Sequence, residues 1–149
     1  MTNYERSNSI IEVDFRVSKT ACRHARRLLV SKSTAKRQAI SDELLDEIAD
    51  LAEIDIVKLK ISAKKQHHKR SGTRLSMRQY GYYRPGDKYI YINNRTAVRG
   101  QILASKTFLN TLLHEWMHHY DSCKLKLDSI HSKGFYSRLK NLQDDLIRG

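Results

Sequence analysis

Residues 111–121 read TLLHEWMHHYD and lie inside an apolar stretch that predicts a long helix over about 102–120. Residues four apart on a helix occupy the same face, one turn apart, so His114 and His118 place their imidazoles side by side. Glu115 follows the first histidine directly, and its other neighbours are mostly apolar. The stretch therefore predicts a helix that is buried in the core and carries polar functional groups on one face.

The spacing H-E-x-x-H is typical of zinc metallopeptidases. Two neutral imidazole nitrogens on one helix face can bind a single Zn²⁺ ion. A glutamate beside the first histidine can take a proton from water at such a centre and pass it to a leaving amine. A helix with surface histidines and a solvated glutamate is the competing interpretation, and the apolar neighbours argue against it. We therefore expect His114 and His118 as metal ligands and Glu115 as the catalytic base.

A catalytic zinc site needs a third protein ligand. The metzincin extension would place glycine at 121 and histidine at 124, but the chain has Asp121 and Lys124 there. The gluzincin type needs a later glutamate, and none follows Glu115. His131, just before the last predicted helix, is the preferred third ligand. Asp121 is the alternative, although its carboxylate is better suited to accept a hydrogen bond from a ligand histidine.

Two other possible ligands that lie close to His118 in the sequence are less suited to bind the metal. His119 points about 100° away around the helix, so we expect it to lie outside the site. A lone Cys123 near a helix end is more often a packing residue than a ligand.

Outward from this helix, the pattern predicts helices and a small group of strands. A helix is expected from Ser18 to about Val30, a second one N-capped by Ser41, strands over Val57–Ile61, 75–83 and 88–93, a basic loop over 66–72, and a last helix from near Ser132. The turn Arg84-Pro85-Gly86-Asp87 joins the last two strands into a hairpin. The strand over 88–93 is expected at the edge of the sheet, where an extended substrate could pair with it.

The order of these elements predicts an α+β fold. Its sheet should be small, antiparallel or mixed and three-stranded, packed with helices of which one is a zincin-like active-site helix. Residues 1–12 are polar and expected to be flexible, and residues 13–149 are expected to form one domain.

Positive charge dominates the chain. It has 28 Lys and Arg residues against 16 acidic ones, a formal net charge of +12, and the excess lies in 16–37, 58–78 and 124–140. Such a field attracts polyanions, so DNA is the expected nucleic-acid partner. An anionic membrane surface is the weaker candidate.

The cellular location is predicted from what the sequence lacks. Two cysteines, Cys22 and Cys123, are too few for a disulfide framework. Residues 1–9 have no apolar signal-peptide core, and no apolar run approaches the length of a membrane span. We expect a cytoplasmic protein, inside the cell and with no membrane contact.

The C-terminal half resembles the SprT-like family, which includes the Spartan proteases. The resemblance rests on LLHEWMHHYD followed by HSKGFYSRL, where a third histidine, His131, is followed four residues later by an aromatic residue, Phe135. The stretch YGYYRPGDKYIYIN is also similar to the strand pair before the active helix of that family. The likeness covers about residues 55–140.

The resemblance implies a zinc-dependent endopeptidase with His114, His118 and His131 as ligands and Glu115 as base. Residues 13–149 would then form a single SprT-like metallopeptidase domain. For Spartan-type members it also implies protein substrates that are bound or crosslinked to DNA.

Two other functions remain open from the sequence. One is a non-enzymatic, basic nucleic-acid-binding protein with a structural zinc, which would need a fourth protein ligand such as Asp121 or Cys123. The other is a peptidase without a nucleic-acid role. A peptidase also needs a donor for the developing oxyanion. Tyr136 and Tyr91 are candidates, although core packing is the expected role of both.

Overall fold

The computed structural model describes residues 1–65, 68–71, 74–78, 80–96 and 99–149. The helices are α1 (Asn3–Ser9), α2 (Lys19–Leu29), α3 (Thr34–Ala52), α4 (Ser105–Cys123) and α5 (Lys133–Arg148), and the strands are β1 (Lys58–Lys65), β2 (His68–Ser71), β3 (Arg74–Arg78), β4 (Gly81–Arg84) and β5 (Tyr89–Arg95). None of the helices in these described ranges is long and apolar enough to cross a membrane.

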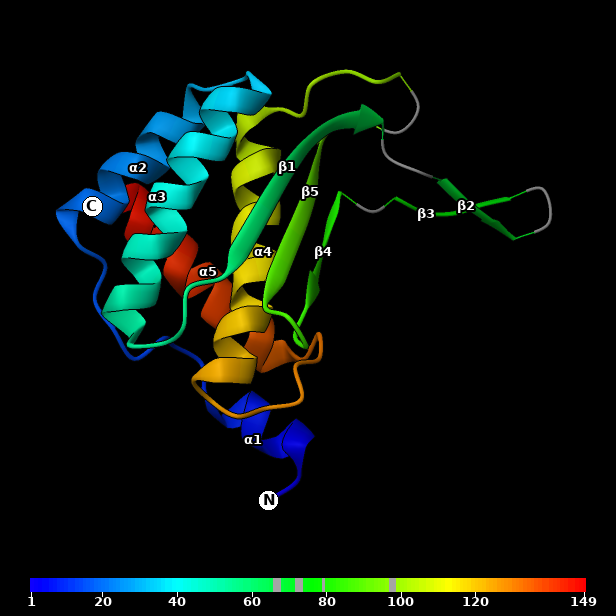
Figure 1. Cartoon of the computed structure of the whole chain (residues 1–149). Coiled ribbons are helices and arrows are strands. Elements are labelled where there is room, and N and C mark those ends of the chain that lie inside the picture. Colours follow the sequence, from blue (N-terminus) through cyan, green and yellow to red (C-terminus); the bar gives the residue numbers. More distant parts are fainter. Residues whose placement is uncertain (66–67, 72–73, 79, 97–98) are drawn as a thin grey trace.

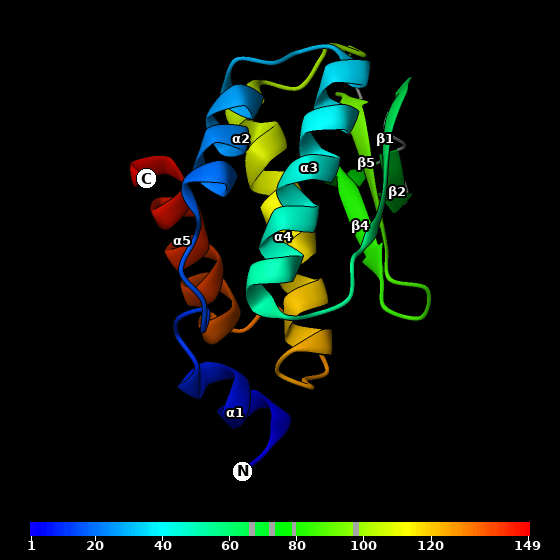
Figure 2. The same cartoon turned by 60° about the vertical axis from the view of Figure 1, so that its left-hand side comes forward.

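The main sheet has three strands in the order β1-β5-β4. β1 runs parallel to β5, and β4 runs antiparallel to it, so the sheet is mixed. Helices α3 and α4 cover one face of this sheet, and α2 and α5 form a further layer behind them (Figures 1 and 2). The predicted α+β fold with a small mixed sheet is confirmed.

Local sequence explains where several elements begin. Ser18 caps α2 and Ser132 caps α5, each accepting a hydrogen bond from the backbone N–H three residues on. β5 alternates between half-buried and buried side chains, and its buried residues Ile90 and Ile92 face the helices. The hairpin between β4 and β5 turns at residues 85–88, as predicted.

Helix α4 runs through the middle of the core. Its largest buried side chains, Phe108, Trp116 and Tyr120, are fully enclosed. Phe15, from the segment before α2, packs its ring against both Trp116 and Tyr120 with centroids 6.0 Å apart. These contacts set the rotation of α4, and they leave its opposite face for the histidines.

The start of α3 differs from the prediction. The helix begins at Thr34, with Ser33 as its N-cap, about two turns before Ser41. Ser41 is a fully buried residue inside the helix. The error arose because the apolar stripe is clear only after Ser41, while the first turns of α3 are polar and packed through Arg37 and Ile40.

The strands also differ from the prediction. Residues 68–71 form β2 instead of a loop, and β2 pairs with β3 in a separate two-stranded sheet. The stretch 75–83 therefore contributes to two strands, with residue 79 outside the described residues, as are residues 66, 67 and 72 of the expected loop. The placement of β5 at a sheet edge was wrong, because β5 lies between β1 and β4, and β4 is the edge strand.

Two helix boundaries are corrected as well. Asn3–Ser9 forms helix α1 within the stretch expected to be flexible, and Thr2 caps it. Helix α4 begins at Ser105, later than predicted, and ends at Cys123.

Candidate metal centre

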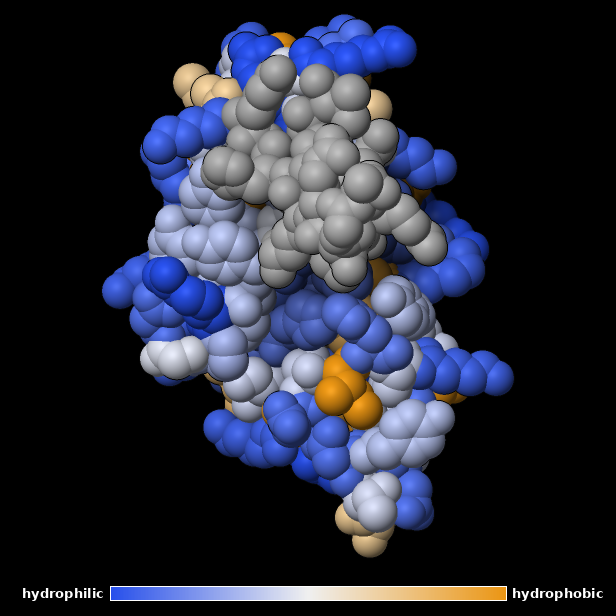
Figure 3. All heavy atoms as spheres, turned by 90° about the vertical axis from the view of Figure 1, so that its right-hand side faces the viewer, coloured by the Kyte–Doolittle hydropathy of each residue, from blue (hydrophilic) through white to orange (hydrophobic). Residues whose placement is uncertain are grey.

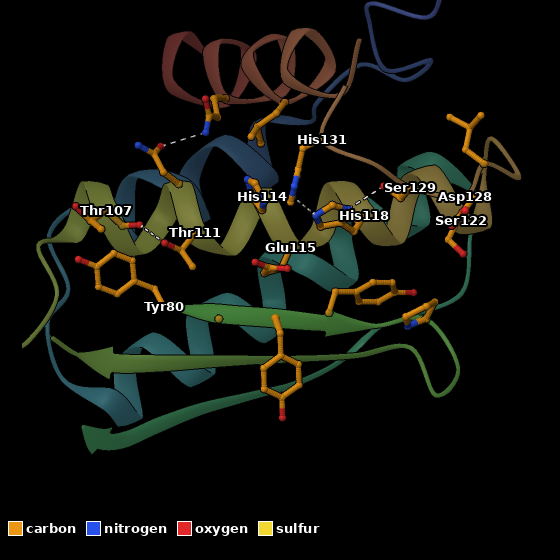
Figure 4. Close-up of a pocket in the computed structure, with 18 residues that line it drawn as sticks. Tyr80, Thr107, Thr111, His114, Glu115, His118, Ser122, Asp128, Ser129 and His131 are labelled. Atoms are coloured by element: carbon orange, nitrogen blue, oxygen red, sulfur yellow. Dashed lines mark hydrogen bonds between the residues drawn. The ribbon is translucent and has the colours of Figure 1, made fainter. Parts of the chain in front are cut away.

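Three histidines converge in the middle part of the cleft between α4, α5 and the sheet edge. His114 and His118 lie on α4, and His131 lies just before α5. The His131 Nε2 atom is 3.1 Å from Nε2 of His114 and 3.0 Å from Nε2 of His118. Figure 4 shows the two helix histidines pointing toward His131. The three nitrogens lie within 4.8 Å of one another, close enough to bind one metal ion.

The surroundings keep the two helix histidines neutral. Burial lowers the pKa of His114 to about 4, and the nearby His131 adds to this effect. Burial, together with His114 and His131, lowers the pKa of His118 to about 3. Because only a neutral imidazole has a lone pair to offer, both side chains are available as ligands near neutral pH.

Glu115 lies beside this cluster on the strand side of α4 (Figure 4). Its side chain lines the same cleft, and the residue is only 8% exposed. Burial raises its pKa from 4.5 to about 7. A carboxyl group with that pKa can both accept and donate a proton near neutral pH.

Ser129 links one of the histidines to buried charges. Its hydroxyl lies 2.8 Å from Nδ1 of His118 and donates a hydrogen bond to Oδ2 of Asp121 at 3.0 Å. Asp121 thus reaches the histidine through the serine and contributes no ligand atom to the cluster. The sequence analysis missed Ser129, because a serine two residues before His131 belongs to no recognisable pattern.

Two other nearby residues point elsewhere. His119 donates from Nε2 to the backbone oxygen of Asp55 at 2.7 Å and accepts at Nδ1 from the hydroxyl of Tyr83 at 2.9 Å. The Cys123 sulfur lies 3.6 Å from His119 Nδ1. Both residues are therefore engaged outside the three-histidine cluster, as expected for His119.

The cleft continues from the histidines along β4. Tyr80–Tyr83 line one wall, and residues of α4, α5 and the loop between these helices line the other. Among the described residues of this lining there is no lysine or arginine, while Glu115 and Asp128 are acidic. The molecular face seen in Figure 3 is mostly hydrophilic, with a small apolar patch.

The two tyrosines proposed as oxyanion donors have different surroundings. Tyr136 is 50% exposed and stacks on His131 with ring centroids 6.0 Å apart, so core packing was the wrong expectation for it. Tyr91 is half-buried and stacks on Tyr82 at 5.3 Å. Neither residue is among the described residues that line the cleft.

The fold and the site together define an α+β protein with a three-histidine cluster able to hold a metal ion. Comparisons with protein-family models, curated proteins and solved structures find no match to the chain.

Proposed function

We propose that the protein is a zinc-dependent endopeptidase that acts on protein substrates. The observation that carries this proposal is the convergence of His114, His118 and His131 beside the buried carboxyl group of Glu115. Three histidine ligands leave the fourth coordination position of a zinc ion to water, and an acidic side chain lies beside them. This arrangement is typical of a catalytic metal centre.

The spacing of the nitrogens fits zinc. Zn–N bonds of about 2.0–2.1 Å at tetrahedral angles separate two ligand nitrogens by about 3.3 Å. The two Nε2···Nε2 distances that involve His131, 3.1 and 3.0 Å, are close to this value. When bound, zinc acidifies water and polarises a carbonyl group.

A closed structural site is less well supported. It would need a fourth protein ligand, and Asp121 and Cys123 are the two candidates nearest in sequence. Asp121 is held by Arg138 and Ser129, and Cys123 lies beside His119. Neither offers an atom to the three-histidine cluster among the described residues. This favours an open, catalytic centre over a structural staple.

In the reaction we assign proton transfer to Glu115. Its carboxylate would take a proton from the attacking water and return it to the amine that leaves the cleaved peptide bond. The side chain faces the cleft next to the ligands, where the scissile bond would lie.

The substrate is proposed to be an extended protein segment. β4 pairs with β5 on one side, and no described strand pairs with its other side. A segment added along that open edge would form backbone hydrogen bonds and would lie in the cleft beside the histidines. Such binding reads the backbone and gives loose sequence preference.

We propose DNA-bound or DNA-crosslinked proteins as substrates, on the basis of the sequence resemblance to SprT-like peptidases. The net charge of +12 supports contact with DNA. Because the described residues of the cleft lining include no lysine or arginine, we propose that DNA binds outside the cleft.

The decisive test is the substitution Glu115→Gln. It should lower the cleavage of an unfolded protein by about 10²–10⁴-fold while the zinc content stays unchanged, because only the proton acceptor is lost. Glu12→Gln, at an exposed position, is the matched control and should cleave like the wild type. His131→Ala should lower the zinc content measured by elemental analysis. Equal cleavage by Glu115→Gln and the wild type would refute the peptidase function.

A further inference from the structure

A chain of hydrogen bonds leads away from the three-histidine cluster. It runs from Nδ1 of His118 to Ser129 Oγ, at 2.8 Å, and from this hydroxyl to Asp121 Oδ2, at 3.0 Å. Asp121 is fully buried. One ligand histidine is thus connected to the protein interior through a single serine hydroxyl.

The protons in this chain can be assigned. A serine hydroxyl has one proton, and here it is donated to the carboxylate oxygen of Asp121. The hydroxyl oxygen must therefore accept a hydrogen bond from the N–H group at Nδ1 of His118. Since a neutral imidazole carries only one N–H, Nε2 is left with its lone pair, and this is the atom that faces His131. Ser129 thus selects the tautomer that can bind a metal through Nε2.

Asp121 is held in turn by Arg138, which is also fully buried. The guanidinium group donates to both carboxylate oxygens, from Nε to Oδ1 at 3.0 Å and from a terminal nitrogen to Oδ2 at 2.8 Å. Its other terminal nitrogen donates to the backbone oxygens of Ser7 and Ile10, both at 2.6 Å. Arg138 therefore joins the network around the metal cluster to the N-terminal segment.

The N-terminal segment makes a second set of contacts, with the loop that carries Ser129 and His131. Asn3 exchanges two hydrogen bonds with the backbone of Asp128, at 2.8 and 3.0 Å. Figures 1 and 2 both show α1 next to this loop and the start of α5. The loop is thereby fixed from the outside as well as through the buried network.

The N-terminal segment also contacts Ser132 and Gly134 at the start of α5. The hydroxyls of Ser7 and Ser132 are 2.6 Å apart, and Asn8 accepts a hydrogen bond from the backbone N–H of Gly134 at 2.8 Å. Gly134 has no room for a Cβ atom against the Ser7 carbonyl group. Ser132 and Gly134, which make these contacts, follow closely after His131 in the sequence.

We propose that residues 3–10 and Ser129 are positioning elements of the metal centre: Ser129 sets the tautomer and orientation of His118, and residues 3–10 hold the loop that presents His131. This inference rests on the metal site of the proposed function. None of these residues offers a ligand atom to the three-histidine cluster, so each acts through a ligand histidine.

The first test is zinc affinity, measured by competition with a chelator in the Glu115→Gln background. Ser129→Ala should weaken zinc binding by about 10–100-fold, the usual effect of losing a partner of a metal ligand. Ser129→Thr keeps the hydroxyl and should restore most of the affinity. Ser137→Ala is the matched control, because it also removes one serine hydrogen bond, to the Lys133 carbonyl group, but one that involves no histidine.

The second test addresses the N-terminal segment. The double substitution Asn3→Ala and Asn8→Ala removes its side-chain contacts with the loop and with Gly134. We expect zinc affinity to fall several-fold, while the metal-free protein keeps its helix content by circular dichroism. Lys140→Ala, which removes an exposed hydrogen bond to Asp144 outside the cleft lining, should leave zinc affinity unchanged.

The outcomes separate this proposal from the peptidase function. Unchanged zinc affinity in Ser129→Ala would refute the role of Ser129, and unchanged affinity in the double variant would refute that of residues 3–10. Loss of affinity in Ser129→Thr equal to that in Ser129→Ala would also count against a hydroxyl-dependent effect. A wild-type protein that binds zinc but cleaves nothing would refute the peptidase alone, because every measurement here is of metal binding.

Discussion

At the scale of single residues, the carboxyl group of Glu115 is in an environment that opposes its charge. It is 8% exposed, and burial raises its pKa to about 7 from 4.5. The adjacent histidines are held neutral by burial, so in the metal-free protein they supply little positive charge to stabilise a carboxylate. A bound cation would change this balance, because its charge favours the ionised acid.

The metal-free protein should therefore lose stability as Glu115 ionises. Its folded pKa is higher than its unfolded pKa, so the folded state binds more protons between about pH 4.5 and pH 7, and stability falls as pH rises through that window. Glu115→Gln cannot ionise. It should match the wild type near pH 4.5 and exceed its free energy of unfolding by up to about 3 kcal/mol at pH 8.

Urea denaturation of both proteins with a chelator present, at several pH values, measures this difference. The histidines titrate alike in the two proteins and cancel in the comparison. A difference between the proteins that stays constant with pH would contradict the buried, destabilised carboxylate.

At the scale of elements, helix α3 provides a test of where a helix begins. Ser33 accepts a hydrogen bond from the backbone N–H of Lys36, at 3.2 Å, and so satisfies one of the free donors of the first turn. Ser41 lies fully buried further along the helix, and its hydroxyl has no hydrogen-bond partner among the described residues. A buried hydroxyl without a partner destabilises the folded state.

The two serines should therefore respond in opposite directions to alanine. Ser33→Ala should lower the free energy of unfolding by about 1 kcal/mol through loss of the cap. Ser41→Ala should raise the free energy of unfolding by up to about 1 kcal/mol. The substitution removes the unpaired hydroxyl, and alanine has a higher helix propensity than serine. Equilibrium denaturation at one pH measures both values. Destabilisation by Ser41→Ala would show that this hydroxyl is bonded in solution.

At the scale of the whole molecule, the described lysine and arginine side chains lie apart from the cleft that contains the three-histidine cluster. The chain has a net charge of +12, whereas the described residues that line the cleft include two acids and no lysine or arginine. Exposed basic residues of the α2 region, such as Arg16, Lys19 and Arg23, lie outside the cleft lining. A polyanion and a protein segment could thus bind at the same time.

Binding to double-stranded DNA should consequently depend strongly on salt. If about 6–10 phosphates are contacted, affinity should fall by about 10³–10⁵-fold between about 50 and 200 mM salt, because condensed counterions are released on binding. Fluorescence anisotropy with a labelled duplex measures the slope. Glu115→Gln should bind DNA like the wild type, since it changes the cleft and not the basic surface. Absence of binding at low salt would refute the proposed contact with DNA.

The features that depend on neighbours along the chain could be predicted from the amino-acid sequence. The four-residue spacing put His114 and His118 on one helix face, the turn at 84–87 defined the hairpin of β4 and β5, and Ser18 and Ser132 marked helix starts. Helical period, turn chemistry and capping are local, so they can be derived from short stretches. The order of elements was then enough for the α+β class.

The features that join distant segments follow from the three-dimensional packing of the chain. The sequence offered His131 as a preferred ligand, but its distance of about 3 Å to both helix histidines depends on how the loop folds back. The bonds from Arg138 to Asp121 and to the Ser7 carbonyl group span 17 and 131 positions, and no local pattern encodes them. The central place of β5, parallel to β1, likewise follows from the packing of β5 against α4 and of β1 against α3. Long-range contacts of this kind are selected by burial and hydrogen-bond satisfaction of the whole core, which the sequence reports only indirectly.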